Sequence, residues 1–205
     1  MFDFIAKGGF LVTPIILCSV IAFAIFVERV IRFAGMRKKG LDLEYKVSDC
    51  ISKGEDDRAF DIAKSSNSPM GRVLAKAVKV KDHDRETMET VIVNATDEEI
   101  RNISTNVQTL ATIANIAPLL GLLGTVIGLI KAFMVIQELG GKVNSAVLAG
   151  GIWEAMLTTA LGLSVALPTM LAHSYLISRI DQYEARLQNG SVIFLTAVSG
   201  RAIKR

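Results

Sequence analysis

The sequence is poor in the residues that build metal centres, disulfide frameworks and nucleic-acid interfaces. Its 205 residues include two cysteines and two histidines, and the formal net charge is only +3. Cys18 lies in an apolar stretch and Cys50 in a charged one, so we expect neither a disulfide framework nor a metal site. So small a net charge gives no indication of nucleic-acid binding.

Motifs of catalysis are missing as well. We find no glycine-rich phosphate loop and no nucleophile motif. The glycines at Gly121 and Gly124 neither follow a strand nor precede a lysine at P-loop spacing. We therefore expect a protein that is not an enzyme and needs no cofactor.

Apolar residues are abundant and gathered into long blocks. They make up 51% of the chain, and the mean hydropathy is +0.42. A helix needs about 20 mostly apolar residues to cross the hydrocarbon core of a bilayer. Three blocks meet this length, and the third of them contains Glu154. The sequence predicts an all-α membrane protein with transmembrane helices at residues 10–30, 109–136 and 147–177.

Basic residues set the expected orientation, because cytoplasmic loops carry an excess of lysine and arginine. One cluster follows the first block and another follows the third. Lys7 is the only basic residue before the first block, and no small-residue cleavage site follows the block. We therefore interpret it as a retained anchor rather than a signal peptide. The predicted topology is N-out and C-in. It has a short periplasmic N-terminus (1–9), a cytoplasmic helical region (31–108), a periplasmic loop (137–146) and a cytoplasmic C-terminal tail (178–205).

The cytoplasmic region is expected to contain a long helix. Residues 65–69 break the pattern, whereas residues 84–136 hold no interior breaker apart from Pro118 and the membrane glycines. We predict one helix from the cytoplasm through the second span, about 75 Å long at 1.5 Å per residue. The charged residues from Glu86 to Arg101, Glu99 among them, are interpreted as its solvated face.

Small residues recur at intervals of three and four in the second and third spans, as membrane helices require for close packing. They include Ala117, Gly121, Gly124 and Gly128 in the second span, and Gly162 and Ala166 in the third. The spacing leaves open whether these stripes pack within one chain or between subunits.

Polar residues within the spans are the candidate functional residues. Thr125, Thr158 and Thr159 lie mid-span, where a threonine often only bonds a carbonyl one turn back. Glu154 is a functional candidate because an ionisable group in a membrane helix is costly. Thr158 shares the helix face of Glu154. Thr159 is turned about 140° away from Glu154, at 100° per residue. Lys131 is expected to snorkel or to pair with Glu138.

Two segments resemble the ExbB/TolQ/MotA superfamily, whose members convert proton-motive force into work. They are LATIANIAPLLGLLGTVIG at 110–128 and GIWEAMLTTALGLSVALP at 151–168. MotA-like stators typically add a fourth span, so the ExbB/TolQ branch fits better. Lys131 and Trp153 depart from the family pattern, and the short N-terminal stretch leaves the choice between ExbB and TolQ roles open.

The resemblance implies a homopentamer in the bacterial inner membrane, with a central pore lined by the second and third spans. It also implies a pair of single-span ExbD/TolR-like helices in that pore, each carrying a membrane aspartate. A TonB/TolA-like protein and membrane lipids are further implied partners, and nucleic acid is not. Thr125, Thr159 and Glu154 match the family's pore positions, and we expect Thr158 to contribute beside them.

Three alternatives remain. The chain could be a passive membrane scaffold, a MotA-like or gliding-motor stator, or a stand-alone ion channel. The channel is weakest, because no aspartate lies within a span.

Overall fold

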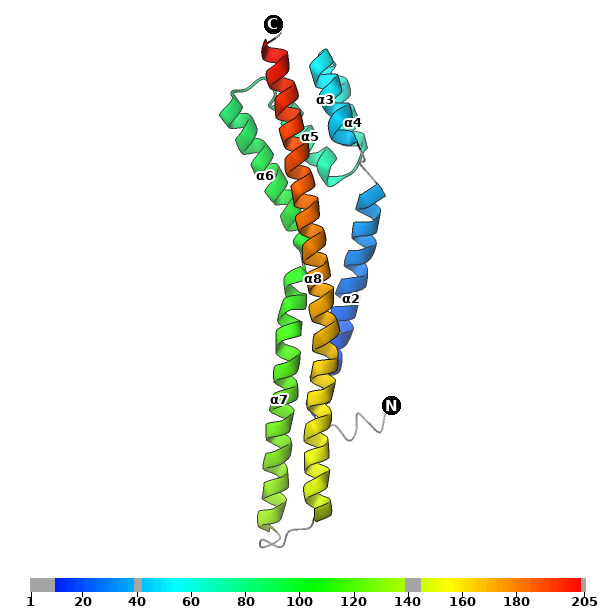
Figure 1. Ribbon diagram of the computed structural model, residues 1–205, viewed down its shortest axis with the longest axis vertical. Coiled ribbons are helices and arrows are strands. Elements are labelled where there is room, and N and C mark those ends of the chain that lie inside the picture. Colours follow the sequence, from blue (N-terminus) through cyan, green and yellow to red (C-terminus); the bar gives the residue numbers. More distant parts are fainter. Residues whose placement is uncertain (1–9, 39–41, 139–144, 204–205) are drawn as a thin grey trace. The chain divides into compact units, whose positions relative to one another are not determined.

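The computed structural model describes residues 10–38, 42–138 and 145–203, which are helical apart from short turns (Figure 1). The helices are α2 (Val12–Lys38), α3 (Leu43–Lys53), α4 (Asp56–Ser65), α5 (Pro69–Lys79), α6 (Arg85–Ser104), α7 (Val107–Glu138) and α8 (Ser145–Ile203). The described residues contain no strand, which agrees with the all-α prediction. The predicted periplasmic N-terminus (1–9), most of the predicted loop at 137–146 and the last two residues of the predicted tail (178–205) lie outside the described residues.

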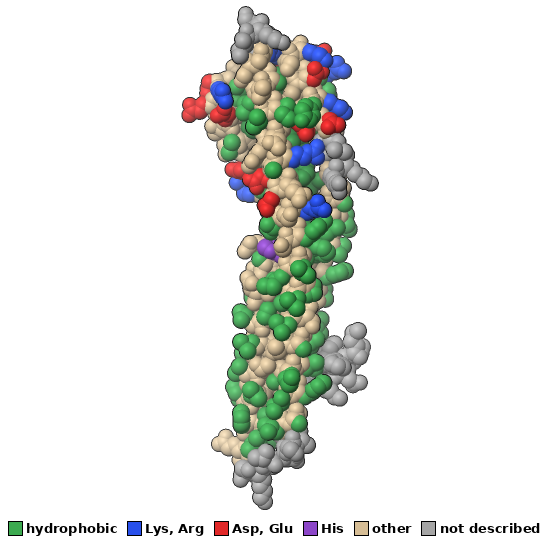
Figure 2. All heavy atoms as spheres, viewed as in Figure 1, with side chains coloured by type: hydrophobic (Ala, Val, Ile, Leu, Met, Phe, Trp, Pro, Cys, Tyr) green, Lys and Arg blue, Asp and Glu red, His purple; other side chains and the backbone are tan. Residues whose placement is uncertain are grey.

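The chain divides into two compact units, which we name by their composition. The span unit comprises Met1–Glu28 and Asn106–Tyr175, and the bundle unit comprises Arg29–Thr105 and Leu176–Arg205. Charged side chains gather on the bundle unit, whereas hydrophobic side chains cover the span unit (Figure 2).

The helices of the span unit are long and apolar enough to cross a membrane. The three candidate spans are Val12–Met36, Val107–Glu138 and Leu148–Arg201. Large apolar side chains point outward on all three helices, and 70% of Phe23, 62% of Leu119 and 74% of Leu171 is exposed. Soluble monomers rarely expose so continuous an apolar surface. The three predicted apolar spans are therefore present.

The predicted single helix over residues 84–136 is wrong. α6 ends at Ser104 and α7 begins at Val107, with Asn106 between them at φ 62°. Asparagine adopts this left-handed conformation more readily than most residues. Two of the last carbonyls of α6 are satisfied by side chains: Thr105 Oγ1 donates to Arg101 O at 3.1 Å, and the buried Arg29, distant in sequence, donates to Ile103 O at 3.3 Å. The break escapes sequence inspection since it contains neither glycine nor proline.

The longest helix is instead α8, whose 59 residues correspond to about 90 Å at 1.5 Å per residue. It continues the predicted third span (147–177) into the segment that we predicted as a cytoplasmic C-terminal tail (178–205). Pro168 lies inside it and removes one backbone hydrogen bond from the helix.

The core of the bundle unit combines α3, α4, α5 and α6 with the last part of α8. Leu187 and Phe194 of α8 are fully buried and pack with Val47, Val73 and Leu74. α5 starts with a capped turn, because Ser68 Oγ accepts from Gly71 N at 3.1 Å and Pro69 takes the first helical position.

Glu99 does not belong to a solvated face, contrary to our interpretation. It is 4% exposed, and Arg72 donates to it twice, Nε to Oε1 at 2.7 Å and Nη2 to Oε2 at 2.5 Å. A two-point contact of this kind is among the stronger ion pairs, because both donors fit the planar carboxylate. It joins α5 to α6.

Asp56 connects the end of α8 to the rest of the bundle unit. Its carboxylate accepts from Arg201 Nη1 at 2.7 Å and lies 3.0 Å from Lys81 Nζ. Burial acts to raise the pKa of Asp56, but the hydrogen bonds from Lys81 and Arg201 outweigh it and hold the pKa below its ordinary value of 3.8.

Replacing Asp56 with Asn should lower the melting temperature of the full chain in detergent at pH 7, by about 2–4 °C per 1 kcal/mol lost. Because the folded-state pKa is lowered, this stabilisation is fully present above the unfolded pKa and is lost as pH falls through the folded pKa. The difference between wild type and variant should therefore shrink in strong acid. Asp57→Asn, at the exposed neighbouring position, is the control, and an equal loss from it would contradict this role of Asp56.

Candidate functional site

The small-residue stripes of α7 and α8 pack against each other within one chain. A Cβ added to Gly121 would lie 3.0 Å from Thr159 Cα, and one added to Gly162 would lie 2.6 Å from Ala117 O. Gly128 likewise lies against Ala155, where an added Cβ would come within 3.0 Å of the alanine Cβ. The order of these contacts along the two helices shows that α7 and α8 are antiparallel. Within this one chain, therefore, stripe residues of α7 contact stripe residues of α8.

Thr158 lies inside this contact. It is 2% exposed, and its side chain occupies the space next to Gly124, where an added Cβ would collide with it. Its hydroxyl donates to Ala155 O of its own helix at 2.7 Å. The structure thus places Thr158 with the packing residues Ala117, Gly121, Gly124, Gly128, Gly162 and Ala166, all of which are buried.

Thr159 joins the two helices by a hydrogen bond. Its Oγ1 donates to the carbonyl oxygen of Gly121 at 2.9 Å, across 38 positions of sequence. Thr125 instead donates to Leu122 O of its own helix at 2.6 Å. Both threonines are half-buried, so their hydroxyls lie at the edge of the contact rather than inside it.

Glu154 forms an ion pair with Lys131. Lys131 Nζ lies 3.4 Å from Glu154 Oε1, and the side chains are 56% and 30% exposed, respectively. Of the two expectations for Lys131, snorkelling or pairing with Glu138, the second is not met, because its ion pair is with Glu154 on the facing helix. Sequence inspection could not find this partner, because the two residues are 23 positions apart.

Helix geometry places these polar residues on two opposite flanks of the α7–α8 contact. At 100° per residue, Glu154 lies about 75° to one side of the contact line through Ala155, Thr158 and Gly162, and Thr159 lies about 65° to the other. On α7 the same geometry separates Thr125 from Lys131. Because the helices are antiparallel, one edge carries Thr125 and Thr159, which we call the threonine flank. The other carries Lys131 and Glu154, which we call the ion-pair flank.

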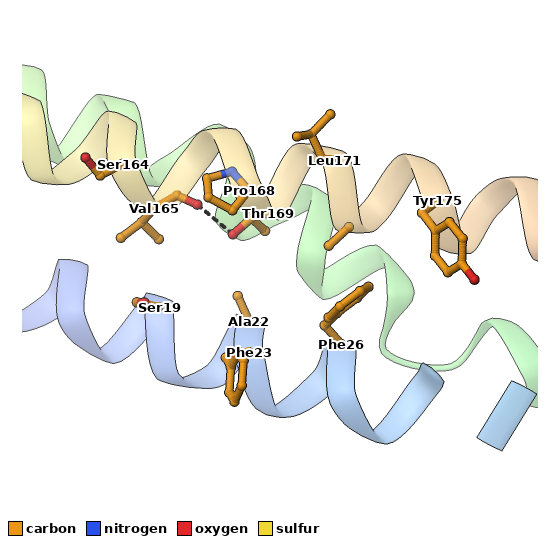
Figure 3. A pocket seen from close by; sticks show the side chains of 11 residues that line it. Ser19, Ala22, Phe23, Phe26, Ser164, Val165, Pro168, Thr169, Leu171 and Tyr175 are labelled. Atoms are coloured by element: carbon orange, nitrogen blue, oxygen red, sulfur yellow. Dashed lines mark hydrogen bonds between the residues drawn. The ribbon is translucent and has the colours of Figure 1, made fainter. Parts of the chain in front are cut away.

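α2 lies against α8 on the side of the ion-pair flank. Ala172, which faces α2, follows Glu154 by 18 residues, and this separation is about five whole turns. A groove of about 460 Å³ runs between the two helices, and the Phe26 ring meets the Tyr175 ring edge-on at its end, with centroids 6.5 Å apart (Figure 3). The groove is lined by Ser19, Ala22, Phe23, Phe26, Ser164, Val165, Pro168, Thr169, Leu171, Ala172 and Tyr175. α2 thus leaves the threonine flank uncovered.

Gly162→Ala should weaken the α7–α8 contact, because the added methyl group would meet the Ala117 carbonyl, a backbone atom that cannot easily move. Overpacking of this kind typically costs about 1–3 kcal/mol. Gly150→Ala is the matched control, since an added Cβ there has no neighbour within 4 Å. Thermal melting in mild detergent should fall for Gly162→Ala only. Equal melting temperatures for the two variants would contradict the packing of the stripes within the chain.

The described residues hold no cluster of three or more His, Cys, Asp or Glu side chains that could bind a metal ion. The arrangement instead offers two hydroxyls and one ion pair along a tightly packed pair of apolar helices. Such an arrangement can pass protons along hydroxyls or shape an electric field.

Comparison with known proteins identifies relatives of this chain. It is 31% identical over 187 residues to an ExbB-like protein of Synechocystis sp., and this alignment covers 89% of this chain and 72% of the relative. It is 34% identical over 135 residues to an ExbB homolog of Methanothermobacter thermautotrophicus, covering 66% of this chain and 47% of the relative. It is also 36% identical over 109 residues to the Tol-Pal system protein TolQ of Haemophilus influenzae, covering 53% of this chain and 47% of the relative.

The family match covers most of the region described above. Residues 65–189 match the MotA/TolQ/ExbB proton channel family, and this segment contains the whole of α7 and the span part of α8. The family resemblance predicted from the two sequence motifs is confirmed. The chain belongs to the MotA/TolQ/ExbB proton channel family.

Proposed function

We propose that the chain is the stator subunit of an energy transducer driven by proton-motive force, of the ExbB–ExbD/TonB or TolQ–TolR type. Five copies surround a central pore in the bacterial inner membrane, with N-terminus outside and C-terminus inside. The pore holds two single-span helices of the ExbD/TolR type, and proton flow is coupled through them to a TonB/TolA-like protein.

The threonine flank is the observation that carries this proposal. It presents the hydroxyls of Thr125 and Thr159 on the side of the α7–α8 pair that α2 leaves uncovered. A pore-facing surface must remain free of the subunit's own first helix, and this flank meets that condition. Residues 109–136 and 147–177, the predicted second and third spans, carry no aspartate, so in this proposal the proton-carrying carboxylate comes from the partner helix.

The hydroxyls have a chemical role in this proposal. A threonine hydroxyl both donates and accepts hydrogen bonds, so Thr125 and Thr159 can hand a proton toward a carboxylate without becoming charged. The apolar surface around them excludes bulk water and other ions. Glu154 and Lys131 add a fixed pair of charges to the field around this path.

The orientation is supported by the charge distribution. Arg29 and Arg32 follow the apolar part of α2, and Arg179 and Arg186 follow that of α8. All four belong to the bundle unit. Cytoplasmic segments are rich in such residues, so this unit lies in the cytoplasm.

Thr159→Val should abolish proton-driven work, because it removes a hydroxyl from the path while keeping the side-chain volume. The lost interhelical hydrogen bond costs only about 0.6 kcal/mol on average in membrane proteins, so the assembled complex should persist. Proton uptake would be followed with a pH-sensitive dye in vesicles that hold the chain with its co-expressed partner, and assembly by size-exclusion chromatography.

Thr169→Val is the matched control. Thr169 lies on the same helix and bonds Val165 O of its own backbone at 2.7 Å, and it faces α2 rather than the threonine flank. Full proton uptake by Thr159→Val, or an equal loss in Thr169→Val, would overturn the proposed proton path.

The composition of the complex tests the proposal separately. The tagged chain should co-purify in mild detergent with a small single-span protein that carries a membrane aspartate, at about two copies per five. A pure oligomer without such a partner, even after cross-linking in intact cells, would favour a passive scaffold.

A further inference from the structure

The groove between α2 and α8 has no role in the proton path. It encloses about 460 Å³ and follows residues 164–175 of α8, a length of about 16 Å at 1.5 Å per residue. Ala22 and Ala172 line it with methyl groups only, which leaves the space open (Figure 3). Phe23 and Leu171 also line it, and 70% and 74% of their surfaces are exposed. The hollow is therefore open on its outer side.

The lining of the groove suits hydrocarbon better than water. Ser164 Oγ donates to Ala160 O and Thr169 Oγ1 donates to Val165 O, both at 2.7 Å, so these hydroxyls are engaged by their own helix. A buried water molecule needs two to four polar partners, and the further hydroxyl of Ser19 cannot supply them alone. An unfilled groove would forfeit the dispersion contacts of its apolar walls.

The size of the groove separates two apolar occupants, a helix and a single hydrocarbon chain. A helix with its side chains is about 10 Å across, so about 16 Å of it would need roughly 1,300 Å³. A methylene chain is about 4–5 Å across, because carbon atoms approach to about 3.5–4.0 Å, and it needs roughly 200–350 Å³ over the same length. Only the chain fits within about 460 Å³.

The location of the groove indicates where such a chain comes from. α2 lies on the side of the ion-pair flank, whereas the threonine flank is uncovered. In the proposed pentamer the threonine flank faces the pore, so the α2 side is turned toward the bilayer. The inference rests on the proposed function for this orientation alone.

We propose that the α2–α8 groove is a lipid site that holds one acyl chain of a membrane phospholipid. The chain fills the space left by Ala22 and Ala172 and packs against the ring of Phe26. It thereby adds apolar contacts that join α2 to the α7–α8 pair, in a medium where packing supplies the attraction between helices.

A filled groove tests the site. Ala172→Leu places three further carbon atoms in the space of the acyl chain. Ala24→Leu is the matched control, because Ala24 is exposed and is turned about 160° from Ala22 on the same helix. The full chain with its co-expressed partner would be reconstituted in vesicles of phosphatidylethanolamine and phosphatidylglycerol with brominated acyl chains. After extraction in mild detergent, native mass spectrometry would count the brominated phospholipids per chain.

We expect one brominated phospholipid per copy to remain on wild type and on Ala24→Leu. Ala172→Leu should retain about fivefold fewer, because its side chain overpacks the filled groove. Phospholipid added to the delipidated wild type at about ten times its half-saturating concentration should raise the melting temperature by about 3–6 °C. The melting temperature of Ala172→Leu should not respond.

Two results would overturn the inference: equal retention by the two leucine variants, or a wild type that retains no phospholipid. Thr159→Val should retain as much phospholipid as wild type. Full proton uptake by Thr159→Val would contradict the proposed function instead, and the phospholipid count would still decide whether the groove is a lipid site.

A photochemical cross-link keeps the test decisive if Ala172→Leu fails to fold. Phe23 would be replaced by p-benzoylphenylalanine, and the full complex would be irradiated in intact membranes. The chain should gain the mass of a phospholipid. A cross-link to a second copy or to another protein would overturn the inference, because protein would then fill the groove.

Discussion

The close approach of the α7 and α8 backbones is the constraint on which the rest of the span unit depends. Gly121, Gly128 and Gly162 let the helices meet where a single added methyl group would collide with backbone or side chain. In lipid no hydrophobic force draws helices together, so contacts of this closeness supply the attraction. The same contact fixes the rotation of both helices, and with it the direction in which every polar side chain of the two spans points.

That fixed rotation explains why the candidate residues fall into groups that face different directions. Thr158 lies within the contact and packs, whereas Thr125 and Thr159 lie on one edge and Lys131 and Glu154 on the other. The two sequence motifs contain Thr125, Thr158, Thr159 and Glu154 and identify them as one set, whereas Lys131 lies outside both motifs. Their division needs the pairing of the helices, since residues of one motif can point in different directions: Glu154 and Thr159, five positions apart, are turned about 140° from each other.

The sequence predicted the three spans, the family and the stripe residues, because apolar length and residue spacing are local properties. Features that depend on distant residues were missed. The break at Asn106 coincides with Arg29 bonding a carbonyl 74 positions away, and Glu99 is buried because Arg72 of another helix reaches it. We placed the end of the predicted third span at residue 177, where apolar residues give way to charged ones, and α8 continues beyond it with Leu187 and Phe194 buried.

The bundle core also imposes an order on biosynthesis. Residues 43–104 leave the ribosome early, yet the core that they surround is completed by Leu187 and Phe194 near the end of the chain. Two apolar spans must be translated and handed to the insertion machinery in between. The nascent bundle therefore exposes an unfilled apolar surface while about 80 residues are synthesised. At about 5–20 residues per second this takes roughly 4–16 s.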